Sequence, residues 1–280
     1  MSIILSLDVE RDWFGGEYYA SEPVFDITRR ALRGILSLAS ELGIPLTLFF
    51  TGEAASALSD LDVDGHDIGV HTHPFTHLFP RGKWDPSIDY LAKYGLREQK
   101  AFISMDKSLV EEAFGIKARM FRAGRLSANE VTLKALSALG FRYDSSTYKG
   151  PNLCGWRPYF VHDQRVVEVP VFCFLGIRVK PLIIRSLIAL VSIFAQRDAY
   201  AVIVIHPQEF ARKGALKVLY DALSISPSSF CRMRDVRRAS RARGPYDILS
   251  RLVSLNALKS LRALYMGKYH PADRQTTARK

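Results

Sequence analysis

The chain has few cysteines and no long uninterrupted apolar run, and these two shortages exclude several classes of protein. Its 280 residues include three cysteines, Cys154, Cys173 and Cys231, which are widely spaced and form no CxxC pair. This pattern does not fit a disulfide framework, and it predicts free thiols in a reducing compartment. The most apolar later run, residues 181–195, is short and contains Arg185, so we do not expect an ordinary transmembrane helix there.

The sequence also lacks a basic leader, a repeat of fixed period and a glycine-rich phosphate loop. Residues 1–7 are apolar but carry no Lys or Arg, and Asp8 ends the apolar run. We therefore expect a strand here rather than a signal peptide. Together with the free thiols, this start predicts a cytoplasmic location.

Positive charge is concentrated near the end of the sequence. Of the formal net charge of +11, residues 230–280 supply +10, from thirteen Lys and Arg against three Asp and no Glu. We expect residues 1–236 to form a catalytic barrel and residues 237–280 a basic amphipathic helical extension and tail. This extension either contacts the inner membrane surface or packs on the barrel with a solvated basic rim. Nucleic acid is not an expected partner, because no known nucleic-acid-binding fold surrounds the charge.

Short apolar runs alternate with segments of helical periodicity, and polar residues follow the apolar runs. This order is typical of an α/β protein with a parallel sheet, either a barrel or a doubly wound sheet. Hydrophobic residues make up 48% of the chain, enough for a sizeable core. The strands are expected at residues 3–7, 45–50, 119–121, 141–143, 166–174 and 200–205, and the helices at 25–42, 91–114, 129–139, 182–194 and 246–264.

The stretch of residues 65–77 contains four of the seven histidines. Neutral imidazole is a common ligand of Zn²⁺ and related ions, so clustered histidines point to a divalent metal. Residues two apart on a strand share a face, which allows His71 and His73 to converge on one ion. His73 and His77 are four apart, a spacing that suits one helical turn. The irregular segment 79–89 that follows is a candidate wall of the substrate site.

Five stretches in order resemble the motifs of the polysaccharide deacetylase family, the NodB-homology or carbohydrate esterase family 4 group. They lie at residues 5–10, 65–72, 121–125, 141–146 and 202–207, and the second is the most specific. The resemblance extends over residues 3–236. It implies an α/β fold, a distorted (β/α)7 barrel of the polysaccharide deacetylase type, to which the basic C-terminal helical extension is added.

The resemblance also implies a role for each motif residue. Asp8 would be the general base, and Glu10 would hold a metal ion together with histidines. Arg122 would pair with the base carboxylate and keep it ionised. His206 would be the general acid, and Asp144 would hold it in the active tautomer.

The sequence leaves the second histidine ligand open. The Gly-His-x-Ile-Gly-x-His pattern of residues 65–71 favours His71 as the first ligand. In the family the two metal-binding histidines are four residues apart, which would place the second at Phe75. Either His73 or His77 must replace it, with His73 slightly favoured, and His66 is expected to be structural. The cofactor is expected to be a divalent metal, Zn²⁺ in the first place, with Co²⁺ or Mn²⁺ as alternatives.

The implied function is metal-dependent removal of an N-acetyl or similar N-acyl group from an amino sugar in glycan or glycolipid biosynthesis. The substrate would be a small carbohydrate or a lipid-linked sugar. Two alternatives remain: hydrolysis of a non-sugar linear or cyclic amide, and a catalytically inactive glycan-binding role. The irregular spacing of the candidate metal-binding histidines motivates the inactive alternative. The sequence does not indicate an oligomeric state.

Overall fold

The computed structural model describes residues 2–12, 22–80, 85–146, 159–161, 165–171, 173–174, 177–178 and 200–236. The predicted helix at residues 182–194 and the proposed basic extension at 237–280 lie outside these residues. The division of the chain at residue 236 therefore stays a prediction.

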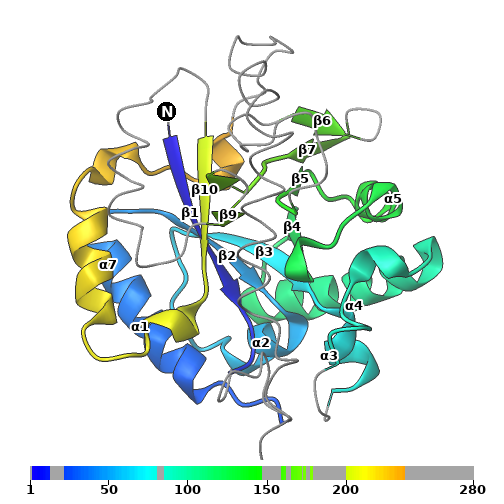
Figure 1. Ribbon diagram of the computed structural model, residues 1–280, viewed down its shortest axis with the longest axis horizontal. Helices are drawn as coiled ribbons and strands as arrows, with labels where there is room; N and C mark the ends of the chain where they lie inside the picture. The colour runs from blue at the N-terminus through cyan, green and yellow to red at the C-terminus, as the bar shows by residue number, and fades with distance from the viewer. Residues whose placement is uncertain are drawn as a thin grey trace, which may run out of the picture.

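Seven parallel strands form one curled sheet, with helices around it (Figure 1). In spatial order they are β10 (Tyr200–Ile205), β1 (Ser2–Val9), β2 (Leu46–Phe50), β3 (Asp67–Thr72), β4 (Met120–Ala123), β5 (Tyr143–Asp144) and β7 (Val166–Glu168). The antiparallel β6 (Tyr159–Val161) borders β7, and β8 (Cys173–Phe174) pairs with β9 (Ile177–Arg178) in a separate small sheet. An isolated parallel bridge between Val171 and Val202 joins the two ends of the parallel run. The expected distorted barrel is thus confirmed, and the doubly wound alternative is not adopted.

Helices cover the outside of the curled sheet. In Figure 1, α1 and α7 lie on the left and α4 and α5 on the right. The helices are α1 (Asp26–Glu41), α2 (Gly52–Ala57), α3 (Pro74–Leu78), α4 (Leu96–Phe114), α5 (Glu130–Ala138) and α7 (Ala215–Leu223), and the 3-10 turns are η1 (Leu91–Lys93), η2 (Gly124–Leu126), η4 (Pro207–Phe210), η5 (Pro227–Ser229) and η6 (Met233–Asp235). Within the described ranges, none of the helices is both long and apolar enough to span a bilayer.

The sequence signals of two helices explain where they begin. The carboxylate of Asp12 accepts hydrogen bonds from the backbone N–H groups of Ile27 and Thr28, so it satisfies free donors in the first turn of α1. The helix expected at residues 91–114 is interrupted at Gly95. There η1 ends and α4 begins, and the Glu98 carboxylate accepts from the Gly95 N–H.

Alternation along the strands separates two apolar cores. The outer core lies between the sheet and the helices and includes Phe121. The inner core fills the barrel, with Phe49 and Met120 among its members and Tyr143 and Val167 packed against them. Because neighbouring residues on a strand point to opposite faces, the register of each strand decides which polar side chains can reach the barrel interior.

Gly69 makes room for the inner core. A Cβ atom at this position of β3 would lie 2.7 Å from the Phe49 ring and 2.9 Å from the backbone oxygen of Met120. Gly69→Ala should therefore lower the free energy of unfolding by about 1–3 kcal/mol, as overpacking does, measured by urea denaturation. Gly34→Ala on α1 is the control and should cost far less, because its new methyl group meets the movable end of Leu216. An equally small loss of unfolding free energy in Gly69→Ala and Gly34→Ala would show that β2 and β4 shift to accommodate the methyl group at little cost.

Candidate active site

A fully buried arginine ties three strands together at the carboxyl end of the barrel. Arg122 on β4 donates from Nη1 to Asp8 Oδ1 at 2.6 Å, and from Nη2 to the hydroxyls of Ser6 and Ser145 at 2.9 and 3.0 Å. Its Nε donates to the Ser145 carbonyl, and its guanidinium lies over the Phe49 ring at 4.2 Å. Burial alone would raise the pKa of Asp8, but Arg122 and the neighbouring histidines hold that pKa well below its usual range. Asp8 is therefore ionised at neutral pH.

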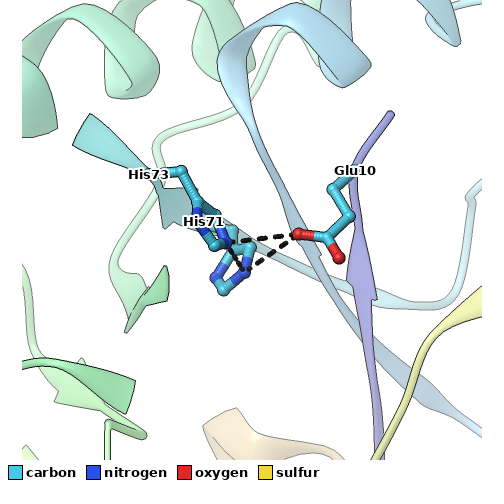
Figure 2. A group of neighbouring side chains, drawn as sticks. All are labelled: Glu10, His71 and His73. Atoms are coloured by element: carbon cyan, nitrogen blue, oxygen red, sulfur yellow. Dashed lines mark hydrogen bonds and ion pairs between the residues drawn. The ribbon is translucent and has the colours of Figure 1, made fainter. Parts of the chain in front are cut away.

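Three further side chains point toward one another (Figure 2), and one of them, His71, has its Nε2 atom 3.9 Å from Asp8 Oδ2. Glu10 follows the end of β1, His71 lies on β3, and His73 begins α3. Their ligand atoms all lie within 4.8 Å of one another, and all three residues are buried. The two histidines thus share a face, as their spacing on an extended segment predicts.

The distances within this group suit a divalent metal. His73 Nε2 lies 3.1 Å from His71 Nε2 and 3.2 Å from Glu10 Oε2, and His71 Nε2 lies 3.8 Å from the same oxygen. Ligands of a tetrahedral Zn²⁺ with bonds of about 2.0–2.1 Å are about 3.3 Å apart. Two imidazoles and one carboxylate leave an open position, which is the composition of a catalytic rather than a structural zinc site.

The outer nitrogens of both histidines are occupied, so their Nε2 atoms face the proposed ion. His71 Nδ1 donates to the carbonyl of Arg122 at 3.0 Å, and His73 Nδ1 to the carboxylate of Asp89 at 2.9 Å. Burial opposes protonation of His73, yet Asp89 and Glu10 outweigh it and raise its pKa to about 10. The buried carboxylates therefore favour positive charge at this point, and a divalent ion would supply it.

The segment after β4 is shaped around His73. A Cβ at Gly124 would lie 2.6 Å from three atoms of the His73 ring, so only glycine allows this approach. The next two residues, Arg125 and Leu126, have φ values of 55° and 54°, which non-glycine residues rarely adopt. Backbone strain of this kind is characteristic of functional sites. Gly124 therefore allows the backbone after β4 to lie directly against a histidine of the metal-binding group.

His206 faces the same group from the end of β10. Its Nε2 lies 3.6 Å from Glu10 Oε1 and 3.9 Å from Asp8 Oδ2. Its side chain is 21% exposed, more than the metal-binding residues, so it borders the solvent side of the site. The carboxylate of Glu209 lies 3.9 Å from His206 Nδ1 and accepts from the His206 backbone N–H at 3.1 Å.

The structure does not bring His77 to the metal-binding group, which corrects the alternative that made it a ligand. His77 lies on α3, and the helix turns its ring away from His73 towards α4. There His77 Nε2 lies 3.1 Å from Asp106 Oδ2, and its ring stacks on Phe102. His66, expected to be structural, accepts from the backbone N–H of Leu46 at the start of β2.

Asp144 does not support His206, contrary to the role that the family resemblance implied. Its position pairs with Phe121 on β4 and Glu168 on β7, and Phe121 belongs to the outer core. Asp144 thus points to the helix-facing side of the sheet, away from the barrel interior. There Ser146 donates to it, and burial raises its pKa to about 6, with Ser146 and Glu168 acting in the opposite direction.

Three residues of the site region carried no signal of their own in the sequence. Asp89 holds His73, Glu168 lies against Asp144, and Gln208 bonds to the backbone of the loop that carries Glu10. Asp89 falls in the segment expected to form a substrate wall. A polar residue in an irregular segment has no periodicity that fixes its direction, so sequence reasoning could not assign it a partner.

Comparison with known proteins agrees with this geometry. Residues 24–143 match the sequence model of the polysaccharide deacetylase family. An assigned polysaccharide deacetylase from Mycobacterium smegmatis has a similar structure, with a TM-score of 0.61 and 18% sequence identity; the alignment covers 86% of this chain and 93% of that protein. An assigned polysaccharide deacetylase from Pseudomonas aeruginosa PAO1 also has a TM-score of 0.61, with 17% identity, and the alignment covers 84% of this chain and 88% of that protein. The allantoinase PuuE has a TM-score of 0.59 at 16% identity, over 84% of this chain and 88% of its own. No curated protein matches the chain significantly.

A curled parallel sheet with acidic and histidine side chains at the carboxyl ends of its strands is typical of barrel hydrolases. The sequence match makes this assignment more specific. Residues 24–143 carry a polysaccharide deacetylase domain, the domain of hydrolases that act on carbon–nitrogen bonds other than peptide bonds.

Asp89 can be tested as the residue that orients His73. Asp89→Asn keeps the size of the side chain but removes its charge, so it should weaken divalent metal binding by about 10–100-fold. Titration of metal-free protein against a chromophoric chelator would measure this. Asp85→Asn in the same segment is the matched control, because Asp85 is exposed and its hydrogen bonds go to Ser87 rather than to a histidine. Equal affinities for the two variants would contradict the role of Asp89.

The Asp144 carboxyl predicts a pH dependence of stability. Its pKa is about 6 in the folded protein, against the ordinary 3.8 of an aspartate, so between these pH values the folded state binds more protons than the unfolded chain. The contribution of Asp144 to stability therefore falls as pH rises through this window. Asp144→Asn should be more stable than the native protein at pH 8, by on the order of 2 kcal/mol, and the gain should vanish towards pH 4. Urea unfolding at both pH values tests this, and an equal change at both would contradict it.

Proposed function

We propose that this protein is a metal-dependent N-deacetylase of an amino sugar that takes part in glycan or glycolipid biosynthesis. The observation that carries the proposal is the convergence of Asp8, Glu10, His71, His73 and His206 at one end of the barrel. Hydrolysis of an acetamide needs an activated water, a base and an acid for the leaving nitrogen. These residues provide a candidate for each requirement.

Each residue has a task that follows from its contacts. Asp8, kept ionised by Arg122, accepts the proton of the attacking water. His206, at the solvent border, donates a proton to the leaving amine. Glu10, His71 and His73 would hold a divalent ion, which would lower the pKa of water and polarise the acyl carbonyl. Arg122 and Asp89 keep the two histidine rings in the tautomer that leaves Nε2 available.

A second candidate is hydrolysis of a small linear or cyclic amide that is not part of a sugar. The similarity to the allantoinase PuuE favours it, because the same fold serves that enzyme. A third candidate is a catalytically inactive glycan-binding protein. The amide hydrolase differs from the amino-sugar deacetylase only in its substrate, and the glycan-binding protein differs from both in having no turnover. One assay therefore separates all three.

The cytoplasmic location and the contact of residues 237–280 with the inner membrane surface belong to the same proposal. A lipid-linked sugar would be presented at that surface, where basic residues bind anionic headgroups. The charge of +10 in residues 230–280 supports the contact. Zn²⁺ is the metal that the two imidazoles and one carboxylate favour, with Co²⁺ and Mn²⁺ as alternatives.

Acetate release from a panel of acetamido sugars tests the proposed reaction, with small linear and cyclic amides as the competing panel. Activity should be lost on dialysis against a chelator and return with Zn²⁺. Asp8→Asn should lower kcat by about 10²–10⁴-fold, because the general base is removed. Asp60→Asn, an exposed carboxylate paired with Arg29, is the control and should leave kcat unchanged.

Full activity in metal-free protein would remove metal dependence from the proposal. Turnover of amides but not of acetamido sugars would favour the second candidate. Sugar binding without turnover, unaffected by Asp8→Asn, would favour the third.

A further inference from the structure

We propose that Gln208 is a positioning residue that sets the distance between Glu10 and His206; this inference rests on the proposed function of the site. Gln208 lies in η4, two residues after His206. Its Nε2 donates to the backbone carbonyl of Glu10 and to that of Arg11, both at 3.0 Å. One side-chain amide thus joins the loop that carries the proposed general acid to the loop that carries the proposed metal ligand.

The sheet itself does not hold these two loops together. The parallel register between β1 and β10 ends at the pair Leu7 and Ile205. Among the described residues, Glu10 and His206 therefore lie beyond the last β1–β10 pair, and the ladder between these two strands does not extend to them. The contact of 3.6 Å between His206 Nε2 and Glu10 Oε1 depends on what joins the two segments past this point.

The chemistry of the amide suits it to this task. Both partners of Nε2 are carbonyl oxygens, so the group must be the NH₂ end, and it uses both of its hydrogens. The side chain is 9% exposed, and its Oε1 has no hydrogen-bond partner among the described residues. The two donated bonds are therefore the polar contacts that orient the amide. No carboxylate could replace it without placing an acceptor against two acceptors.

The Glu10 carbonyl has a second donor from a different direction. Thr28 Oγ1 on α1 lies 3.0 Å from it, and η4 packs on the same helix. Glu10 is thus held between α1 and η4 through its backbone, which leaves its carboxylate directed at the two histidines. Loss of the Gln208 bonds would remove the two hydrogen bonds that tie this loop to η4, so the loop could shift relative to His206. A displacement of about 1 Å at a catalytic group can cost on the order of 10²-fold in rate.

The test compares Gln208→Met with Gln99→Met in the full-length protein. Gln99 on α4 is a fully buried amide that donates to the Tyr94 carbonyl at 2.8 Å and accepts from the Thr132 hydroxyl, outside the site. The affinity of each protein for Zn²⁺ is measured first. Metal-free protein without substrate competes for the ion with a chromophoric chelator. Gln208→Met should weaken zinc binding by about 10–100-fold, the usual effect of losing a partner that orients a ligand, and Gln99→Met should not.

The second readout is steady-state kinetics, in which kcat and KM are determined separately for whichever acetamido sugar or amide is turned over. Gln208→Met should lower kcat at least tenfold at saturating zinc and leave KM within about twofold, because the bonds position reacting groups rather than substrate. Gln208→Glu should behave in the same way, which guards against a folding defect specific to the methionine. Thermal unfolding of all three variants checks that each is folded.

Native zinc affinity in folded Gln208→Met and Gln208→Glu would overturn the inference. So would a loss of affinity of the same size in Gln99→Met, because it would indicate general destabilisation. If no substrate is turned over but zinc affinity depends on Gln208 as expected, the proposed function fails while the positioning role stands.

Discussion

The pairing of Arg122 with Asp8 is the interaction on which the site depends. Both side chains are buried, so neither charge can be satisfied by solvent, and an unpaired charge at this depth would cost about 3–5 kcal/mol. The pair joins β4 to β1, and the remaining donors of Arg122 reach Ser6 and Ser145. It also decides the chemistry, because it keeps Asp8 ionised and because the Arg122 backbone carbonyl orients His71. One residue therefore links strand packing, the charge of the proposed base and the tautomer of a proposed ligand.

Parallel strands allow this concentration of roles. Their carboxyl ends meet at one edge of the barrel, so residues separated by about two hundred positions become neighbours there. His71 and Arg122 are paired in register on β3 and β4, which places their side chains on the same face. The apolar partners serve the same end: Phe49 supports the guanidinium, and Gly69 leaves space for Phe49.

The pattern of apolar residues predicted an α/β protein with a parallel sheet, and the family resemblance implied the barrel and most of the residues that meet at its edge. The buried strands and the shared face of His71 and His73 follow from patterns of apolar residues and a period of two. The two roles that the structure does not support failed for a geometric reason. Asp144 lies on a strand of two residues, where the sequence cannot fix which face a side chain takes, and His77 lies on a short helix that rotates it towards Asp106. Asp89 and Gln208 act through hydrogen bonds between distant loops, which no local pattern encodes.

The bridge between Val171 and Val202 shows how unevenly the strand pairing is distributed around the barrel. Among the described residues it is the one pairing between the β7 and β10 ends of the parallel run, whereas β1 is paired to both of its neighbours along most of its length. The residues at the carboxyl edge come from the arc that runs from β10 through β1 to β4. The chemistry of the site is therefore built on the part of the sheet where consecutive strands share continuous ladders.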